Sequence, residues 1–290
     1  MHKNVRIIVV LGLILNILLT VIKISAGLIG DSYSLFSDGI NSLSDVVISI
    51  TLILTIKYAS KKPDKDHPYG HEKYEAVINM FLGIFLLVTA ILLSLNSILS
   101  IETFKEPKTF TIVIAVIAIF IKIVIYQINI IGYKKYNQVS LKADAYNHLG
   151  DILATSLSLI SIILARNNIK YMENIAAVLI SVIIFINGLK VIKDATNYMV
   201  DLSPKKSFNK KVKEFINSID GVIKIDDYKS RLHVKNIYID VEIQVDRNLS
   251  LIDAHKIAED VHIKVENKFK EVLHCMVHVN PSKEVSELNE

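Results

Sequence analysis

The sequence predicts a bundle of six membrane-spanning helices followed by a small soluble α+β domain. Hydrophobic residues make up 51% of the 290 residues, and the chain contains no Trp. Several apolar stretches reach the roughly 20 residues that a helix needs to cross a bilayer. From about residue 203 the composition changes to segments that alternate polar and apolar residues. We therefore expect a six-span transmembrane domain over residues 1–202 and a cytoplasmic αββαβ domain over residues 203–290.

Lys and Arg are unevenly distributed between the spans, which are predicted at about 5–29, 32–58, 75–101, 109–132, 140–165 and 172–196. The second and fourth linkers and the segment after the last span carry three to five of these residues each, and the short N-terminal tail carries Lys3 and Arg6. The first linker has none, and the third and fifth have two each. Because positively charged linkers remain in the cytoplasm, both termini are predicted to be cytoplasmic.

The two ends of the chain carry further signals. The first apolar stretch is too long for a signal peptide and lacks a small-residue cleavage site, so we interpret it as a retained span. The one cysteine, Cys275, allows no intrachain disulfide, which indicates a reducing compartment for the soluble part.

Capping residues and alternation define the C-terminal elements. Ser203 is a favourable N-cap with Pro204 in the first helical position, and Gly221 closes this segment. The remaining pattern predicts two strands, a second helix capped by Ser250 and a last strand, at residues 222–234, 235–245, 250–270 and 272–280. Three strands covered on one face by two helices are expected.

A repeated polar motif interrupts the second and fifth spans. "SDGINSLSD" ends at Asp45 and "ADAYNHLGD" ends at Asp151, and both contain D-x-x-N-x-x-x-D. Helical residues four apart share a face, so Asn41 with Asp45 can oppose Asn147 with Asp151. Two neighbouring carboxylates repel each other unless a cation or protons join them. We therefore predict a cation site here; the alternative is hydrogen bonding that only holds the helices together.

Other charged residues in the spans need partners. Lys23 and Asp38 lie at similar depths in the first two spans, which predicts an ion pair between them. Lys122, in the middle of the fourth span, either extends its stem towards the interface or compensates the acidic site when no metal is bound. His148, about 100° around the helix from Asn147, either joins the site or bonds to a neighbouring span.

These features together resemble the cation diffusion facilitator family, whose members export divalent transition metals. The resemblance covers the six spans, the paired motifs, the His-rich linker "PDKDHPYGHEKYE" and the αββαβ segment. It implies a transport site at Asn41, Asp45, Asn147 and Asp151. Zinc-selective members usually have His or Asp at the first position of each pair, whereas manganese- and iron-handling relatives more often have Asn or Asp. Oxygen ligands also suit harder cations such as Mn²⁺.

The resemblance also implies a metal site in the linker between the second and third spans. The family pattern D-x-x-H-x-x-x-H corresponds to Asp64, His67 and His71; the alternative is a solvated loop with two surface histidines. The resemblance further implies that Lys73, at the start of the third span, pairs with Asp201 after the sixth.

A third metal site is implied in the soluble domain, at the interface of a homodimer. The matching positions are Asp226, Asp240, His255 and His278. Asp226 replaces a frequent His, and Asn280 stands where an Asp can occur. Three other histidines have no partner in a motif and are predicted to lie on the surface, namely His233, His262 and His274.

The expected function is a homodimeric exporter in the plasma membrane that exchanges cytoplasmic Mn²⁺, Zn²⁺ or Fe²⁺ for external protons. The divalent metal is the substrate and also a candidate regulatory ligand. The rival hypothesis is a membrane sensor or scaffold that binds metal without transporting it. No H-E-x-x-H, G-x-S-x-G or P-loop motif supports an enzyme. Basic residues do not cluster with aromatic ones on one face, so nucleic-acid binding is not expected.

Overall fold

The computed structural model describes residues 3–59, 61, 63–100, 105–136, 139–233 and 236–282. The chain divides into two compact units. The first, here called the helical unit, contains residues 1–56 and 78–192. The second, the C-terminal unit, contains residues 57–77 and 193–290. The linker between the second and third helices therefore belongs to the same unit as the C-terminal domain.

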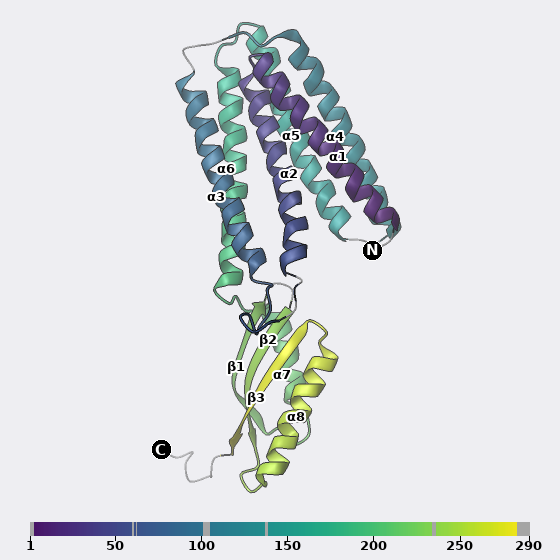
Figure 1. Ribbon diagram of the computed structural model, residues 1–290, viewed down its shortest axis with the longest axis vertical. Coiled ribbons are helices and arrows are strands. Elements are labelled where there is room, and N and C mark those ends of the chain that lie inside the picture. The colour runs from purple at the N-terminus through teal and green to yellow at the C-terminus, as the bar shows by residue number, and fades with distance from the viewer. Residues whose placement is uncertain are drawn as a thin grey trace. The chain divides into compact units, whose positions relative to one another are not determined.

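Long helices account for the N-terminal two thirds of the chain (Figure 1). They are α1 (Lys3–Ile29), α2 (Tyr33–Ala59), α3 (Tyr74–Leu99), α4 (Thr109–Tyr136), α5 (Val139–Arg166) and α6 (Met172–Met199). Within the described residues, five of them are long and apolar enough to cross a membrane. The sixth, α2, has 27 residues, a length comparable to that of the other five.

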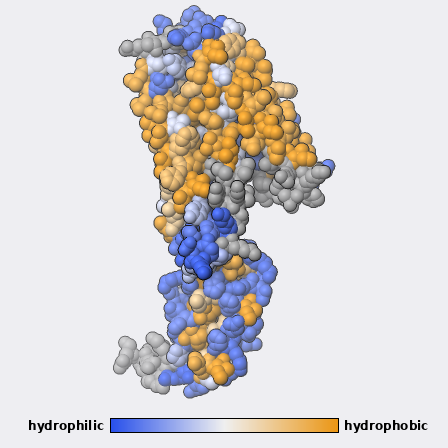
Figure 2. All heavy atoms as spheres, viewed as in Figure 1, coloured by the Kyte–Doolittle hydropathy of each residue, from blue (hydrophilic) through white to orange (hydrophobic). Residues whose placement is uncertain are grey.

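The helical unit has its apolar side chains outside and many of its polar ones inside. Figure 2 shows hydrophobic side chains over the visible surface of this unit. On α4 the outward residues include Val113 and Phe120, which are 53% and 66% exposed. The inward face recurs every three or four residues and consists of Thr111, Ala115, Ala118, Lys122, Ile125, Asn129 and Gly132. Small inward residues allow close helix packing, and polar ones form bonds between helices, as is usual in membranes.

A close backbone contact between α1 and α2 requires a glycine at position 39. A Cβ atom on Gly39 would lie 2.8 Å from the main-chain nitrogen of Ile24, closer than side chains normally approach. Gly39 therefore permits the two helices to pack closely beside the neighbouring residues Lys23 and Asp38.

The C-terminal domain has the predicted order αββαβ. Its elements are α7 (Lys206–Ile216), β1 (Lys224–His233), β2 (Asn236–Val245), α8 (Leu251–Lys268) and β3 (Val272–Pro281). The sheet order is β1-β2-β3, with β1 antiparallel and β3 parallel to β2. Buried Val212 of α7 and Val261 of α8 pack in one core with Ile239 and Ile243 of β2. Two helices therefore share one core with the sheet, as expected.

The helix starts show where capping rules hold and where they fail. The Ser250 hydroxyl accepts a hydrogen bond of 3.1 Å from the main chain of Asp253, so this predicted N-cap is confirmed. The prediction for α7 was wrong, because that helix begins at Lys206 without a side-chain cap. Ser203 instead accepts a 3.0 Å hydrogen bond from Asn209 and contacts Ser230 on β1. The Ser203 hydroxyl therefore bonds to Asn209 and Ser230 and does not cap α7.

Candidate metal centre

Two carboxylates, an amide and an imidazole meet between α2 and α5 of the helical unit. The amide of Asn41 donates a 3.4 Å hydrogen bond to Asp151 Oδ1. The carboxyl group of Asp45 lies near enough to that of Asp151 for the two to interact electrostatically. His148 Nδ1 lies 3.5 Å from Asp151 Oδ2. Asn41, His148 and Asp151 are buried, and Asp45 is half-buried. Asp151 thus contacts Asn41 and His148 and lies near Asp45.

His148 takes the place that the motif predicts for Asn147. His148 is 7% exposed, whereas the side chain of Asn147 is exposed. Successive helical residues differ by about 100° in direction, so the rotation of α5 that buries His148 turns Asn147 outward. The structure therefore brings Asn41, Asp45 and Asp151 together as expected but does not bring Asn147 to them.

Lys122 supplies a counter-charge at this centre. Its ammonium group is fully buried and lies 2.6 Å from Asp151 Oδ2. It also donates a 2.8 Å hydrogen bond to Asn16 Oδ1 of α1. Of the two hypotheses for Lys122, these contacts favour compensation of the acidic site, because the stem does not carry the charge to an interface.

A second buried ion pair lies one turn from the centre. Lys23 Nζ is 2.8 Å from Asp38 Oδ2, and both side chains are fully buried. The ammonium also donates to Thr155 Oγ1 at 2.8 Å and to Ser42 Oγ at 3.3 Å. Thr155 in turn donates to the main-chain oxygen of Asp151. The predicted Lys23–Asp38 pair is therefore joined to the centre through α5.

The linker residues Asp64, His67 and His71 also form a cluster, with their metal-ligand atoms within 4.8 Å of one another. His67 Nδ1 lies 3.4 Å from Asp64 Oδ1, and His71 Nε2 lies 3.2 Å from Asp64 Oδ2. The main-chain hydrogen bond from His67, above all, lowers the pKa of Asp64. The carboxylate is therefore ionised, as a metal ligand must be.

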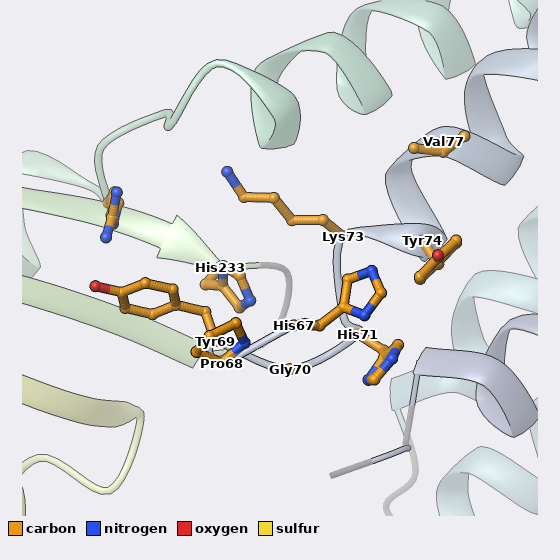
Figure 3. Close-up of a pocket in the computed structure, with 10 residues that line it drawn as sticks. His67, Pro68, Tyr69, Gly70, His71, Lys73, Tyr74, Val77 and His233 are labelled. Atoms are coloured by element: carbon orange, nitrogen blue, oxygen red, sulfur yellow. The ribbon is translucent and has the colours of Figure 1, made fainter. Parts of the chain in front are cut away.

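The same linker lies against residues of the C-terminal domain, within one compact unit. Lys73 Nζ lies 3.1 Å from Asp201 Oδ1, so the expected pair is present. Arg231 of β1 lies 3.6 Å from the other oxygen of Asp201. Figure 3 shows His67, His71 and Lys73 beside His233 in a pocket of about 530 Å³. Burial, first of all, lowers the pKa of His233, which favours its neutral form.

The four residues implied in the C-terminal domain do not converge within one chain. The amide of Asn280 donates to Asp226 at 3.2 Å and to Glu242 at 3.1 Å. His278 is directly opposite Glu242 in the β2–β3 register. His255 lies exposed on α8. Asp240 is also exposed, and it lines a pocket whose lining includes neither Asp226 nor His278.

Sequence reasoning missed Glu242 as a neighbour of Asp226. The signal was available, because side chains two apart on a strand share a face, and Glu242 follows Asp240 by two residues. Whether Asp240 or Glu242 lies beside Asp226 depends on the register in which β2 pairs with β1 and β3. That register contains an irregularity between Ile225 and Asp227, at the position of Asp226 itself.

Comparison with known proteins identifies both parts of the chain. A family model described as the cation efflux transmembrane domain matches residues 9–200. A second, described as the cytoplasmic domain of cation efflux proteins, matches residues 204–282. The nickel form of a variant MamM C-terminal domain is 20% identical, covers 27% of this chain and 100% of that chain, and has a TM-score of 0.27.

Several curated proteins match over nearly the full length. The manganese efflux system protein MneP of Bacillus subtilis is 30% identical over 284 residues, covering 95% of this chain and 96% of that protein. An uncharacterised transporter of Methanocaldococcus jannaschii is 31% identical over 277 residues, with 93% and 96% coverage. The manganese efflux system protein MneS of B. subtilis is 23% identical over 267 residues, covering 91% of each chain. The family consists of transporters rather than enzymes. The chain therefore belongs to the cation efflux family, also called cation diffusion facilitators, and is a multi-pass membrane protein that handles divalent metal cations.

Proposed function

We propose that this protein exports Mn²⁺ from the cell in exchange for protons. The observation that carries the proposal is the meeting of Asn41, Asp45 and Asp151 in the interior of the helical unit. Charged side chains inside a membrane bundle most often mark an ion or proton path. Two relatives that match over most of their length are named manganese efflux proteins, which supports Mn²⁺ as the substrate.

The two carboxyl groups account for both binding and release. When Asp45 and Asp151 are ionised, their charges attract a divalent cation. When protons bind, the neutral carboxyl groups lose that attraction, and the cation leaves. Alternate exposure of the centre to the two sides, by movement of one group of helices against another, then couples metal export to proton entry.

Lys122 stabilises the empty centre in this mechanism. Its ammonium group contacts Asp151 Oδ2, an oxygen that would also bind the cation. An arriving divalent cation must therefore displace the ammonium group, which keeps Asn16 as a second partner. Asp151 has a positive charge beside it in either condition, which avoids leaving this buried carboxylate unpaired.

The donor atoms favour Mn²⁺ without excluding softer cations. Asn41, Asp45 and Asp151 offer oxygen, the donor that suits Mn²⁺, and His148 offers nitrogen, which also suits Zn²⁺ and Fe²⁺. Three of these four ligands are oxygen donors, and we place Mn²⁺ first for this reason.

A homodimer in the plasma membrane, with both chain termini in the cytoplasm, completes the proposal. Asp226 and His278 lie on the sheet, whereas His255 lies exposed on α8. Because these residues do not converge in one chain, a metal site that uses all of them needs a second copy.

Purified protein in proteoliposomes tests transport directly. We expect Asp45→Asn and Asp151→Asn each to reduce Mn²⁺ flux by about tenfold or more, since each 1.4 kcal/mol of lost cation binding is a factor of ten. Asp194→Asn, at an exposed position of α6, is the matched control and should transport normally. An internal pH dye should report proton movement opposite to the metal. Wild-type protein that binds Mn²⁺ without flux would support the sensor hypothesis instead.

Removal of Asp151 should also destabilise the protein through Lys122. Asp151→Asn leaves a buried ammonium group without its anion, which typically costs about 3–5 kcal/mol. The double variant Asp151→Asn/Lys122→Met should recover most of the thermal stability in detergent and still fail to transport. Equal melting temperatures for the single and double variants would show that the two residues are not energetically coupled.

Alanine substitutions distinguish the two candidate ligands on α5. His148→Ala should weaken Mn²⁺ transport and abolish inhibition by competing Zn²⁺, because the imidazole is the softer donor. Asn147→Ala should leave both nearly unchanged, because its side chain faces away from the centre. Impaired transport in Asn147→Ala with normal transport in His148→Ala would instead support Asn147 as the ligand, as the motif predicts.

We further propose that Asp64, His67 and His71 hold a structural or regulatory metal ion. Asp64→Ala should lower the metal content of dialysed protein by one ion per chain, measured by mass spectrometry of the metal. Asp66→Ala removes a neighbouring exposed carboxylate and should not change that content. Unchanged metal content in Asp64→Ala would show that the linker is only a polar loop.

A further inference from the structure

Two histidines and a glutamate form a cluster at the edge of the sheet in the C-terminal domain. His262 and Glu266 lie one turn apart on α8, and His274 lies near the start of β3. His262 Nε2 and His274 Nδ1 are each 3.5 Å from Glu266 Oε1. The two imidazole rings lie 5.5 Å apart between centroids. Three potential metal ligands from two elements therefore face one point.

The separations match those in a tetrahedral metal site. Zinc binds His and carboxylate at about 2.0–2.1 Å, which places two ligands of a tetrahedron roughly 3.4 Å apart. The described residues contain two groups of three or more His, Cys, Asp or Glu whose ligand atoms all lie within 4.8 Å. One is the linker cluster at Asp64, His67 and His71, and this cluster is the other.

The main chain of Cys275 orients both helix residues of the cluster. Its N–H donates a 3.0 Å hydrogen bond to Glu266 Oε1, and its carbonyl oxygen lies 2.8 Å from His262 Nδ1. A hydrogen bond from Nδ1–H to this carbonyl leaves the lone pair of His262 on Nε2, which faces Glu266. Main-chain bonds of this kind commonly fix the orientation of histidine ligands in metal sites.

Hydrogen bonding to the edge strand β3 explains the positions of Glu266 and His262 but not that of His274. β3 is an edge strand, and its free N–H and C=O groups need partners. Glu266 and His262 satisfy these two groups of Cys275. That role does not require His274, which lies beside Tyr238 in the register yet approaches the same carboxylate oxygen. An irregularity at the start of the β2–β3 pairing lies beside His274.

The donor atoms define the class of cation. Two imidazole nitrogens and one carboxylate oxygen suit Zn²⁺, and also Fe²⁺, Co²⁺ and Ni²⁺, better than Mn²⁺. The nearby thiol is not an additional ligand, because Cys275 is buried in the core and burial, above all, raises its pKa to about 12. Three protein ligands leave a fourth position for water or another donor.

We propose that His262, Glu266 and His274 form a binding site for Zn²⁺ or a similar divalent cation that links α8 to the edge strand β3. The site lies outside the transport centre and uses none of the residues Asp226, Asp240, His255 or His278. Its donors are softer than those of the transport centre. It therefore responds to a cation that differs in class from the proposed substrate.

Protection of histidines from chemical modification tests the site in the full-length protein in detergent. Diethyl pyrocarbonate modifies accessible imidazoles, and peptide mass spectrometry locates the products. Saturating Zn²⁺ should lower the modification rates of His262 and His274 together, by about tenfold. Modification rates with Mg²⁺ in place of Zn²⁺ serve as the reference, because Mg²⁺ prefers oxygen ligands.

The decisive variant is Glu266→Gln, since the glutamate itself does not react with the reagent. The side-chain amide of this variant would still offer an oxygen to the N–H of Cys275, so the fold should persist while the anionic ligand is lost. Zn²⁺ protection of both histidines should then disappear. Glu259→Gln, at an exposed position of α8, removes the same charge and should retain protection.

Each outcome decides the proposal. Joint protection in the wild type and its loss only in Glu266→Gln support the site. Absence of protection in the wild type, or protection unchanged by Glu266→Gln, overturns it. The result is independent of Mn²⁺ flux, so failure of the transport proposal and failure of this site are distinguishable.

Discussion

The requirement that charges inside a membrane bundle be paired governs the helical unit. Lys23 with Asp38 and Lys122 with Asp151 are fully or almost fully buried ion pairs. Each pair joins two helices, and the bonds of Lys122 to Asn16 and of Lys23 to Thr155 add further connections. An unpaired charge at this depth costs several kcal/mol. The groups that stabilise the helix arrangement are therefore the same groups that can bind a cation, which allows binding and movement of the helices to be coupled.

The C-terminal unit combines parts that are far apart in the sequence. Lys73 and Glu72 of the linker contact Asp201 and Asn236, which lie 128 and 164 residues further along the chain. Both candidate metal clusters outside the transport centre lie in this unit. Each combines imidazole with carboxylate, whereas the transport centre has mainly oxygen donors. If both proposals hold, this difference in donor chemistry lets the unit bind cations other than the proposed substrate.

Much of the fold could be predicted from local patterns. Apolar length predicts the long helices, and alternation predicts the three strands within two residues at each end. Ser250 caps α8 because its hydroxyl needs only a partner three residues ahead. Ser203 failed as a cap because Asn209 and Ser230 compete for the same hydroxyl. His262 and His274, predicted to be unrelated surface residues, meet because α8 packs beside the edge of β3.

The sequence by itself determined which residue types lie in the spans and that Asp45 and Asp151 recur in matched motifs. Spacing along one helix suffices for that inference, because residues four apart share a face. Only the tertiary structure decided that His148 rather than Asn147 faces the centre, that Lys122 pairs with Asp151, and that Glu242 lies beside Asp226. Helix rotation and strand register are determined by packing between elements. A shift of one residue changes which side chain faces a site, and no local pattern specifies that shift.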